Sequence, residues 1–399
     1  MGHIVLGEPR LDRFHLHDRL RRALRDRGHR VVVACSTPAL RTFWRHQEGA
    51  EEVLGERALP HFFAAARPDL LLLHQDRTKA SEALAAAAAG AGTRVLWSGE
   101  GLLPHTLQLD EAGTDDHASW TSRTAPQFEV VPVDENLLQT SLAHALADAD
   151  PVALPRAQVR PPPWAERLGD ALGAWRSGPG AMRRAFTGWR QALPGRRSDA
   201  RPVRLPAPPF VALLLQRDDD PRLAAASERI SATALVRATA AAVDHALPGT
   251  SLVVVLPAGA SPRTTFAGHP AVPASAGPTA AATAAVTVTV NHPHACVALL
   301  AGTPVVATGR SAWSLPGVVT MATPPTLARG LAQALATGPD PRLRHFLTWL
   351  LRHGHVWCSP SMPDHNGITG LVQAVEARML PAGKAGLRYR SGPAWPLMP

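Results

Sequence analysis

A short polar turn, Asn291-His292-Pro293-His294, combines residue types that can bind an anion. It follows an apolar run at 286–290 that predicts a buried strand, and it precedes an apolar stretch at 295–300 that predicts a short helix. Turns of this kind present unpaired backbone N–H groups and the positive end of a helix dipole, and α/β proteins hold phosphates there. Asn291, His292 and His294 are therefore predicted to contact a phosphate-bearing ligand, although the two histidines could equally make structural bonds.

Gly302 and Thr303 follow the predicted helix and lead through Pro304 into another strand. The Gly302 backbone and the Thr303 hydroxyl are predicted to contact the same ligand. A plain C-cap role for Gly302 fits the sequence equally well. The nearby His292, His294 and Cys296 do not have the partners of a metal cluster, so no metal site is predicted.

Two carboxylates follow predicted strands and could take part in group transfer. Asp220 comes shortly after the strand at 210–215 and after Gln216, and Glu100 comes after the strand at 94–97 and before Gly101. A carboxylate at such a strand end can act as a nucleophile or as a general acid/base. The alternatives are that Asp220 caps the next helix and that Glu100 is an exposed loop residue.

Asp76 and Arg77 follow a third predicted strand, at 70–74. We expect this pair to bind an acceptor molecule or to orient Glu100. A surface ion pair is the alternative reading.

Strand and helix patterns alternate along the whole chain, which predicts an α/β fold with mostly parallel sheets and right-handed crossovers. In the first half, apolar periodicity predicts helices at 13–27 and 79–91. The predicted strands of this half are 4–7, 30–35, 70–74, 94–97 and 129–133. In the second half, helices are predicted at 231–246 and 295–300, with strands at 210–215, 251–256, 286–290 and 305–307.

The length of 399 residues favours two domains. Pro-rich stretches enclose residues 151–208, where the alternation stops. We expect an N-terminal Rossmann-like acceptor domain at 1–150, a basic helical linker at 151–208, and a C-terminal Rossmann-like donor domain with closing helices at 209–399.

The net charge of +9 is concentrated in the predicted linker, where residues 156–204 hold eleven arginines and three acidic residues. Trp164, Trp175 and Trp189 are interleaved with these arginines. Such helices suit the headgroup region of an anionic membrane, although a solvated surface fits about as well. No nucleic-acid reading motif accompanies the charge, so nucleic acid is not an expected partner.

The expected location is the cytoplasm, peripheral to the inner membrane. The apolar runs are shorter than a membrane span, and no basic, apolar leader precedes the first strand. Three cysteines without metal spacing suit a reducing compartment.

Seven segments resemble, in order, motifs of the capsular-polysaccharide biosynthesis and export family of the KpsS/LipB type. The resemblance is collinear over about residues 1–360. The segments are the start of the chain with Leu6–Pro9, Arg27–Val31 and Phe43-Trp44, then His74–Arg77, Glu100–Gly113, Leu214–Asp220, Asn291–Pro304, Gly309–Gly317 and Phe346–Trp357.

The resemblance implies a GT-B-like fold, in which two Rossmann-like domains with parallel sheets face a central cleft. It implies a retaining, metal-independent glycosyltransferase that moves Kdo, or a similar sugar acid, from a CMP-activated donor to a phosphatidylglycerol-type lipid. The CMP-sugar is a substrate, and no cofactor is expected. The implied partners are this nucleotide sugar, a lipid or lipid-linked acceptor, an anionic membrane surface and capsule synthesis or export proteins.

The resemblance also assigns roles to residues. Asp220 would be the nucleophile or would stabilise an oxocarbenium-like centre, and Glu100 would be the general acid/base. The donor-binding set would be Gln216, Asn291, His292, His294, Gly302 and Thr303. The acceptor or supporting set would be Gly7, Asp76 and Arg77.

The chain departs from the family at three places near the implied donor site. The arginine of the family's Tyr-Leu-Arg-Pro is missing after Gly101, Pro257-Ala258-Gly259 replaces a Lys-x-His-Pro, and Asn291-His292-Pro293 replaces an Asn-Ser-Thr turn. These changes leave open a non-catalytic or donor-switched relative that acts as a subunit of the capsule synthesis and export assembly. A Rossmann oxidoreductase is disfavoured because no G-x-G-x-x-G follows the first strand.

Overall fold

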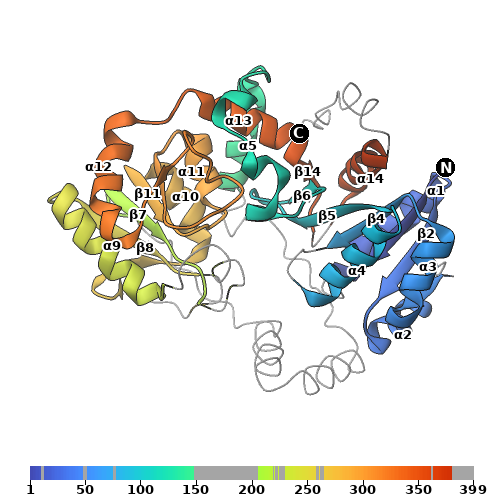
Figure 1. Ribbon diagram of the computed structural model, residues 1–399. Coiled ribbons are helices and arrows are strands. Elements are labelled where there is room, and N and C mark those ends of the chain that lie inside the picture. Colours follow the sequence, from blue (N-terminus) through green and yellow to red (C-terminus); the bar gives the residue numbers. More distant parts are fainter. Residues whose placement is uncertain are drawn as a thin grey trace. The chain divides into compact units, whose positions relative to one another are not determined.

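The computed structural model describes residues 1–9, 13–47, 52–74, 78–147, 205–218, 220, 223, 230–257, 260, 265–360 and 363–379. Within them the chain forms two seven-stranded, mostly parallel sheets with helices against them (Figure 1). The predicted α/β class with two Rossmann-like sheets is confirmed. Most of the predicted 151–208 linker lies outside the described residues, so the domain bounds stay a prediction.

The first sheet has the strand order β14-β6-β5-β4-β1-β2-β3. β1 pairs in parallel with both β2 and β4, and β5 continues in parallel from β4. The strands are β1 (His3–Gly7), β2 (Arg30–Cys35), β3 (Val53–Gly55), β4 (Leu70–His74), β5 (Arg94–Glu100), β6 (Thr106–Asp110) and β14 (His355–Trp357). The helices of this part of the chain are α1 (Phe14–Asp26), α2 (Pro38–Arg45), α3 (Leu59–Ala66), α4 (Lys79–Gly90) and α5 (Glu135–Ala147).

The second sheet has the order β13-β12-β11-β7-β8-β10-β9, and its β9–β10 pair is antiparallel. The strands are β7 (Phe210–Leu214), β8 (Ser251–Val255), β9 (Thr265–Phe266), β10 (His269–Val272), β11 (Val286–Thr289), β12 (Val305–Ala307) and β13 (Thr320–Met321). The helices are α9 (Ala232–Ala246), α10 (Gly277–Thr283), α11 (Ala295–Ala301), α12 (Leu327–Thr337), α13 (Arg342–Trp349) and α14 (His365–Met379). In Figure 1, α9 and α12 cover one face of this sheet, and α10 and α11 cover the other.

Apolar burial explains why these segments become strands. All residues of β4 and β7 are buried, because helices cover both faces of a parallel sheet and leave no solvent-facing side. Around β7, the core of the second sheet includes Val211, Leu213, Val254 and Val288. Around β1 and β4, the core of the first sheet includes Val5, Leu71, Leu73 and Phe63.

The predicted strand at 129–133 is wrong. Residues 125–128 form a short 3₁₀ helix, and a turn follows in which Val131 N–H donates to the Phe128 carbonyl. The apolar side chain of Val130 is 82% exposed. Val130 and Val131 beside Glu129 gave a strand pattern, but within the described ranges no strand pairs with them. The strand that does continue the sheet, β6, was not predicted.

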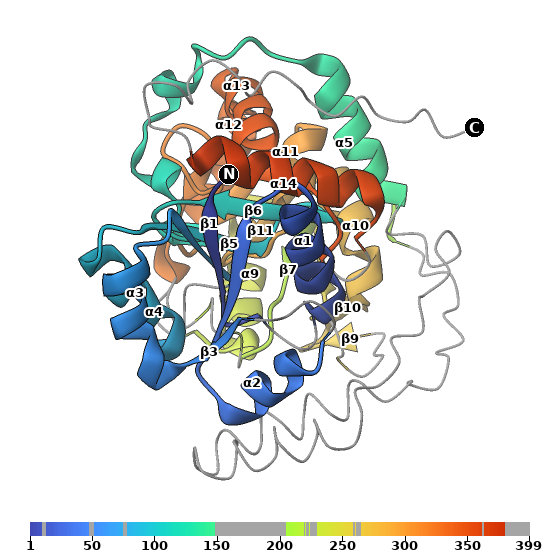
Figure 2. The ribbon, with the colours of Figure 1, turned by 90° about the vertical axis from the view of Figure 1, so that its right-hand side faces the viewer.

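The chain divides into two compact units. The first contains the described residues of 1–98 and 357–379, and the second contains those of 99–147 and 205–356. The closing helix α14, expected with the C-terminal domain, therefore belongs to the first unit. Figure 2 shows α14 beside α1, and contacts between the two helices agree with this view.

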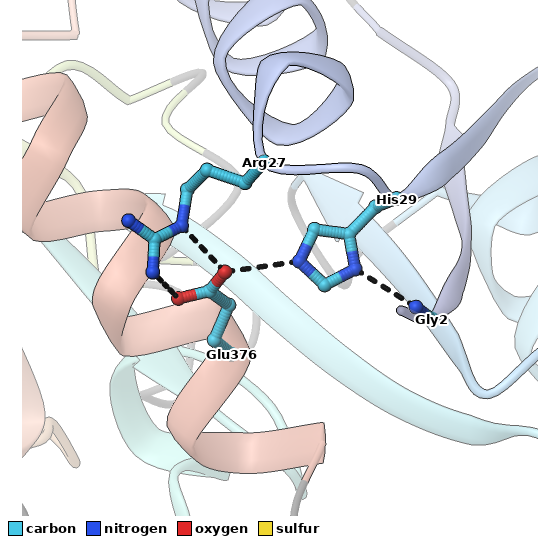
Figure 3. Close-up of polar contacts among 4 residues, drawn as sticks. All are labelled: Gly2, Arg27, His29 and Glu376. Atoms are coloured by element: carbon cyan, nitrogen blue, oxygen red, sulfur yellow. Dashed lines mark hydrogen bonds and ion pairs between the residues drawn. The ribbon is translucent and has the colours of Figure 1, made fainter.

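A polar cluster fixes α14 on the first unit (Figure 3). Arg27 donates from Nε and Nη2 to the two carboxylate oxygens of Glu376, at 2.7 and 2.8 Å. The His29 ring lies between Glu376 and the chain start: its Nε2 is 2.9 Å from Glu376 Oε1, and its Nδ1 accepts from Gly2 N–H. Partial burial raises the pKa of Glu376, but the bonds from Arg27 and His29 outweigh it and leave the pKa below its usual range.

We predict that Glu376→Gln lowers the free energy of unfolding by about 1 kcal/mol, since the amide keeps the shape but loses the charge-assisted pair with Arg27. Urea unfolding at pH 7 measures it. The control is Glu52→Gln, which removes a bidentate pair with Arg30 whose two side chains are 39% and 56% exposed. The control should change stability by less than about 0.5 kcal/mol. Equal effects of the two changes would contradict a fixing role for Glu376.

Candidate functional site

In the second sheet, the order in which the chain adds strands reverses between β7 and β11. From β7 the chain adds β8 and β10 on one side, and then returns to add β11, β12 and β13 on the other. Ligands of open α/β sheets bind at the carboxyl ends of the strands beside such a switch point. Gln216 follows β7 and Asn291 follows β11, so both residues lie at this switch point.

Gln216 connects the two strand ends through its amide. Its Oε1 accepts from the Asn291 backbone N–H at 3.3 Å, and its Nε2 donates to Asp220 Oδ2 at 3.4 Å. Gln216 is 7% exposed and Asn291 is 6% exposed. The structure thus brings together three residues that were predicted separately: Gln216, Asp220 and Asn291.

Asp218, two residues before Asp220, bonds to the start of a helix. Asp218 Oδ1 accepts from the backbone N–H of Ala232, the first residue of α9, at 3.1 Å. Asp218 thus caps α9, together with the Ser231 hydroxyl. Most residues directly after Asp220 lie outside the described ranges, so the capping alternative for Asp220 is not tested.

The turn after β11 is held by side-chain acceptors. Thr289 Oγ1 accepts from His292 N–H at 3.1 Å, and His292 Nδ1 accepts from His294 N–H at 3.1 Å. The two imidazole rings lie 4.5 Å apart between centroids. Because His292 Nδ1 accepts a hydrogen bond, its ring proton belongs on Nε2, which makes Nε2 a donor in the neutral ring.

Gly302 and Thr303 are not brought to this cluster. Gly302 has a left-handed φ of 78° and ends α11, the C-cap role that was its alternative. Thr303 Oγ1 donates to the Ala282 carbonyl at 2.9 Å, which ties the start of β12 to α10. Since α11 separates them from Asn291, both residues lie at the amino-terminal edge of the sheet, away from Gln216.

Glu100 is the last residue of β5, and a tight turn follows it. Gly101 N–H donates to the Thr106 carbonyl at 2.9 Å. A Cβ at Gly101 would lie 1.9 Å from Thr106 Oγ1 and 2.9 Å from the His355 ring, so only glycine fits there. Leu102 N–H donates to His355 Nε2 at 3.0 Å. His355 had no role in the sequence analysis.

His355 is 4% exposed and lies beside a small apolar cavity. Its Nδ1 is 3.2 Å from the Leu350 carbonyl, and since Nε2 accepts from Leu102, the ring proton belongs on Nδ1. Burial lowers the pKa of His355 to about 4. The ring is therefore neutral at physiological pH. The cavity is lined by Leu102, Leu103, Cys296, Leu300, Leu347, Leu350, Leu351 and His355.

The segment that carries Glu100 is tied to the loops of the second sheet. Trp120 Nε1 donates to the Ala312 carbonyl at 2.9 Å. Two residues earlier in that loop, the Arg310 carbonyl accepts from Asn291 Nδ2 at 3.4 Å. The residues from Glu100 to Asp220 that these bonds connect all belong to the second unit.

The first sheet has its own switch point, between β1 and β4. Gly7 ends β1 there, and a Cβ on it would lie 2.5 Å from Leu73 Cδ2, so close packing explains this glycine. Asp76 and Arg77 lie outside the described residues. Glu8 belongs to the Leu6–Pro9 motif but was not among the predicted site residues.

Glu8 has a left-handed φ of 50°, which is uncommon outside glycine and marks a constrained backbone. Its carboxylate accepts from the Ser36 hydroxyl at 2.7 Å and from the Ser36 backbone N–H. Burial raises the pKa of Glu8. The acidic residue directly after the first strand was the signal that could have identified it.

Within the described ranges, no group of three or more His, Cys, Asp or Glu side chains is arranged to hold a metal ion. A search of the same ranges found no helix with the length and hydrophobicity to cross a membrane.

No protein-family model and no curated protein matches the sequence. Among solved structures, the chain is similar to a glycotransferase of kitacinnamycin (17% identity, TM-score 0.37, covering 95% of this chain and 99% of that one). It is also similar to KpsC β-Kdo 2,7 transferase from Thermosulfurimonas dismutans (12%, 0.37, 93% and 99%) and to the spinosyn rhamnosyltransferase SpnG with spinosyn aglycone (14%, 0.37, 94% and 100%). Likeness this distant says nothing about the reaction of this chain.

We predict that acid destabilises the protein through His355. The pKa of this ring is about 4 in the folded state and about 6.5 in an unfolded chain, so between these values the unfolded state binds more protons. Above pH 6.5 the neutral His355 ring makes its full contribution to the free energy of unfolding. As the pH falls to 4, the free energy of unfolding decreases by about 3 kcal/mol.

Urea unfolding at pH 7.5 and pH 5 measures this loss in the wild type and in His355→Gln, which cannot titrate. The wild type should lose about 2 kcal/mol more than the variant over this interval. Parallel pH profiles of the two proteins would show that His355 is not buried as a neutral ring.

Proposed function

We propose that the chain is a glycosyltransferase of capsular polysaccharide biosynthesis, which transfers Kdo or a similar sugar acid from a CMP-activated donor to a phosphatidylglycerol-type lipid. The observation that carries this proposal is the Gln216 bridge at the second switch point, which holds Asp220 beside Asn291. The motif resemblance gave these residues separate roles, Gln216 and Asn291 in donor binding and Asp220 in catalysis.

The donor nucleotide would occupy the carboxyl edge of β7 and β11. Side chains of Gln216, Asn291 and His292 supply amide and imidazole groups for hydroxyl, carbonyl and phosphate oxygens. The His292 ring gives an Nε2 donor while neutral, so it serves a phosphate without first taking a proton. The His294 ring lies against it in a tilted contact. Gly302 and Thr303 are left out of the proposed donor site because they lie at the other edge of the sheet.

Asp220 would face the anomeric carbon as nucleophile or as stabiliser of positive charge, and Glu100 would move the proton of the acceptor hydroxyl. Asp220 follows β7 and is bonded to the Gln216 side chain, and Glu100 ends β5 directly before the turn at 101–103. The proposed reaction is retaining and needs no metal.

The acceptor would be a lipid at an anionic membrane surface, with Asp76 and Arg77 near it. The arginine- and tryptophan-bearing segment 156–204, which lies outside the described residues, would provide the membrane contact. This makes the protein a peripheral partner of the inner membrane and of capsule synthesis or export proteins.

We predict that Gln216→Glu weakens CMP binding about 10-fold or more, because the new carboxylate cannot donate to Asp220 and repels it. Isothermal titration calorimetry with CMP measures this. The control is Gln333→Glu, the same chemical change at an exposed position of α12, which should leave the affinity unchanged. An unaltered affinity in the Gln216 variant would place CMP elsewhere.

We predict that Asp220→Asn keeps CMP affinity within about threefold and lowers transfer at least about 100-fold, because the amide preserves the contact with Gln216 but removes the charge. The assay is incubation with CMP-Kdo and a fluorescent phosphatidylglycerol analogue, with the product mass as readout. CMP binding without transfer by the wild type would favour a non-catalytic binding subunit. Turnover with another nucleotide sugar would retain the class of enzyme and replace the donor.

A further inference from the structure

We propose that His355 is the positioning residue of the turn 100–103 and thereby sets where the Glu100 carboxylate lies. The inference rests on the proposed function for the role of Glu100, but the contacts that support it are independent of any substrate. These contacts link α13, a π-helical turn and β14 to the end of β5.

The backbone leading into His355 has an unusual shape. Helix α13 continues into a π-helical turn, η8 (Leu350–Gly354), and β14 begins at His355. A π-turn adds one residue to the helical repeat and so redirects the side chains that follow it; such turns occur frequently at functional sites. Here the redirected side chain is the imidazole that reaches Leu102 N–H.

Each ring nitrogen of His355 has a backbone partner. Nδ1 lies against the Leu350 carbonyl of the π-turn, and Nε2 accepts from Leu102 at 3.0 Å. The ring is therefore held at one end by the π-turn and holds the β5–β6 turn at the other. Its surroundings are apolar, since the cavity beside it is lined otherwise by leucines and Cys296. A buried amide N–H that lost its acceptor there would be left unsatisfied, which is unfavourable, so the position of the turn depends on the position of the ring.

The turn has no freedom to compensate. Gly101 N–H is bound to the Thr106 carbonyl, and Thr106 Oγ1 donates to the Leu103 carbonyl at 2.7 Å. Gly101 itself is packed between Thr106 and the His355 ring. Glu100 is the residue immediately before these fixed groups. A shift of its carboxylate by about 1 Å can lower a transfer rate by about 100-fold.

The experiment compares His355→Gln with His355→Leu. The oxygen of glutamine is as many bonds from Cβ as Nε2 is, so it can still accept from Leu102, whereas leucine fills the space without an acceptor. Leu350→Ala is the control for general damage, because it enlarges the same cavity and leaves the backbone bond from Leu102 in place.

The first readout needs no substrate: hydrogen–deuterium exchange of the peptide containing Gly101 and Leu102. We expect exchange at least about 10-fold faster in His355→Leu, and wild-type exchange in His355→Gln. In Leu350→Ala, the protection of this peptide from exchange, compared with that of α13, should be the same as in the wild type. Equal exchange in wild type and His355→Leu would overturn the proposal.

The second readout is transfer with CMP-Kdo and the phosphatidylglycerol analogue, measured well below the unfolding temperature of each variant. We expect kcat of His355→Leu to fall 10-fold or more with an unchanged Kd for CMP, and His355→Gln to recover most of it. A loss shared equally by Leu350→Ala would show mere destabilisation and overturn the positioning role. If the wild type binds no CMP and transfers nothing, the proposed function fails, and the exchange comparison still decides whether His355 holds the turn.

Discussion

The candidate site depends on one constraint: parallel strands bring their carboxyl ends to a single edge, and one side chain there must satisfy the groups of both neighbours. Gln216 does this. Its side-chain oxygen accepts a hydrogen bond from the Asn291 N–H after β11, and its side-chain nitrogen donates one to the carboxylate of Asp220. A glutamate could make only the first bond and a lysine only the second. The amide is the group that joins the two strand ends without adding charge, which leaves Asp220 as the charged group of this cluster.

The two sheets share a topology but differ in chemistry at their switch points. In each, one strand has its sequence neighbour on one side and a later strand on the other: β1 between β2 and β4, and β7 between β8 and β11. At the first, Glu8 places a carboxylate directly after the strand and engages the Ser36 hydroxyl and amide. This carboxylate occupies one backbone donor of the edge, the Ser36 N–H. At the second, the apolar Leu215 stands directly after the strand, and the neutral Gln216 follows it. The two switch points therefore differ in the side chains that follow the central strand.

Short sequence patterns predicted the features that depend on neighbouring residues. The alternation of strands and helices gave both sheets, and the polar residues after the strands at 210–215 and 286–290 gave Gln216, Asp220 and Asn291. The failures have long-range causes. Residues 129–133 have valines but no partner strand, and β6 depends on pairing that no short pattern reveals. His355 lies about 250 positions from the turn it contacts, and a histidine in an apolar stretch carries no sign of its partner. Gly302 fitted two roles equally, and the fold selected the helix cap because α11 turns its end away from the cluster.

His292 and His355, both in the second unit, have the same kind of hydrogen bond to the backbone. In each, one ring nitrogen accepts a backbone N–H: His292 Nδ1 from His294, and His355 Nε2 from Leu102. Protonating that nitrogen would break a bond that shapes the turn, and at His355 burial also lowers the pKa of the ring to about 4. The remaining nitrogen is then committed as a donor. At His355 that donor is used inside the protein, against Leu350. At His292 the other nitrogen, Nε2, carries the ring proton in the neutral form, because Nδ1 accepts from His294.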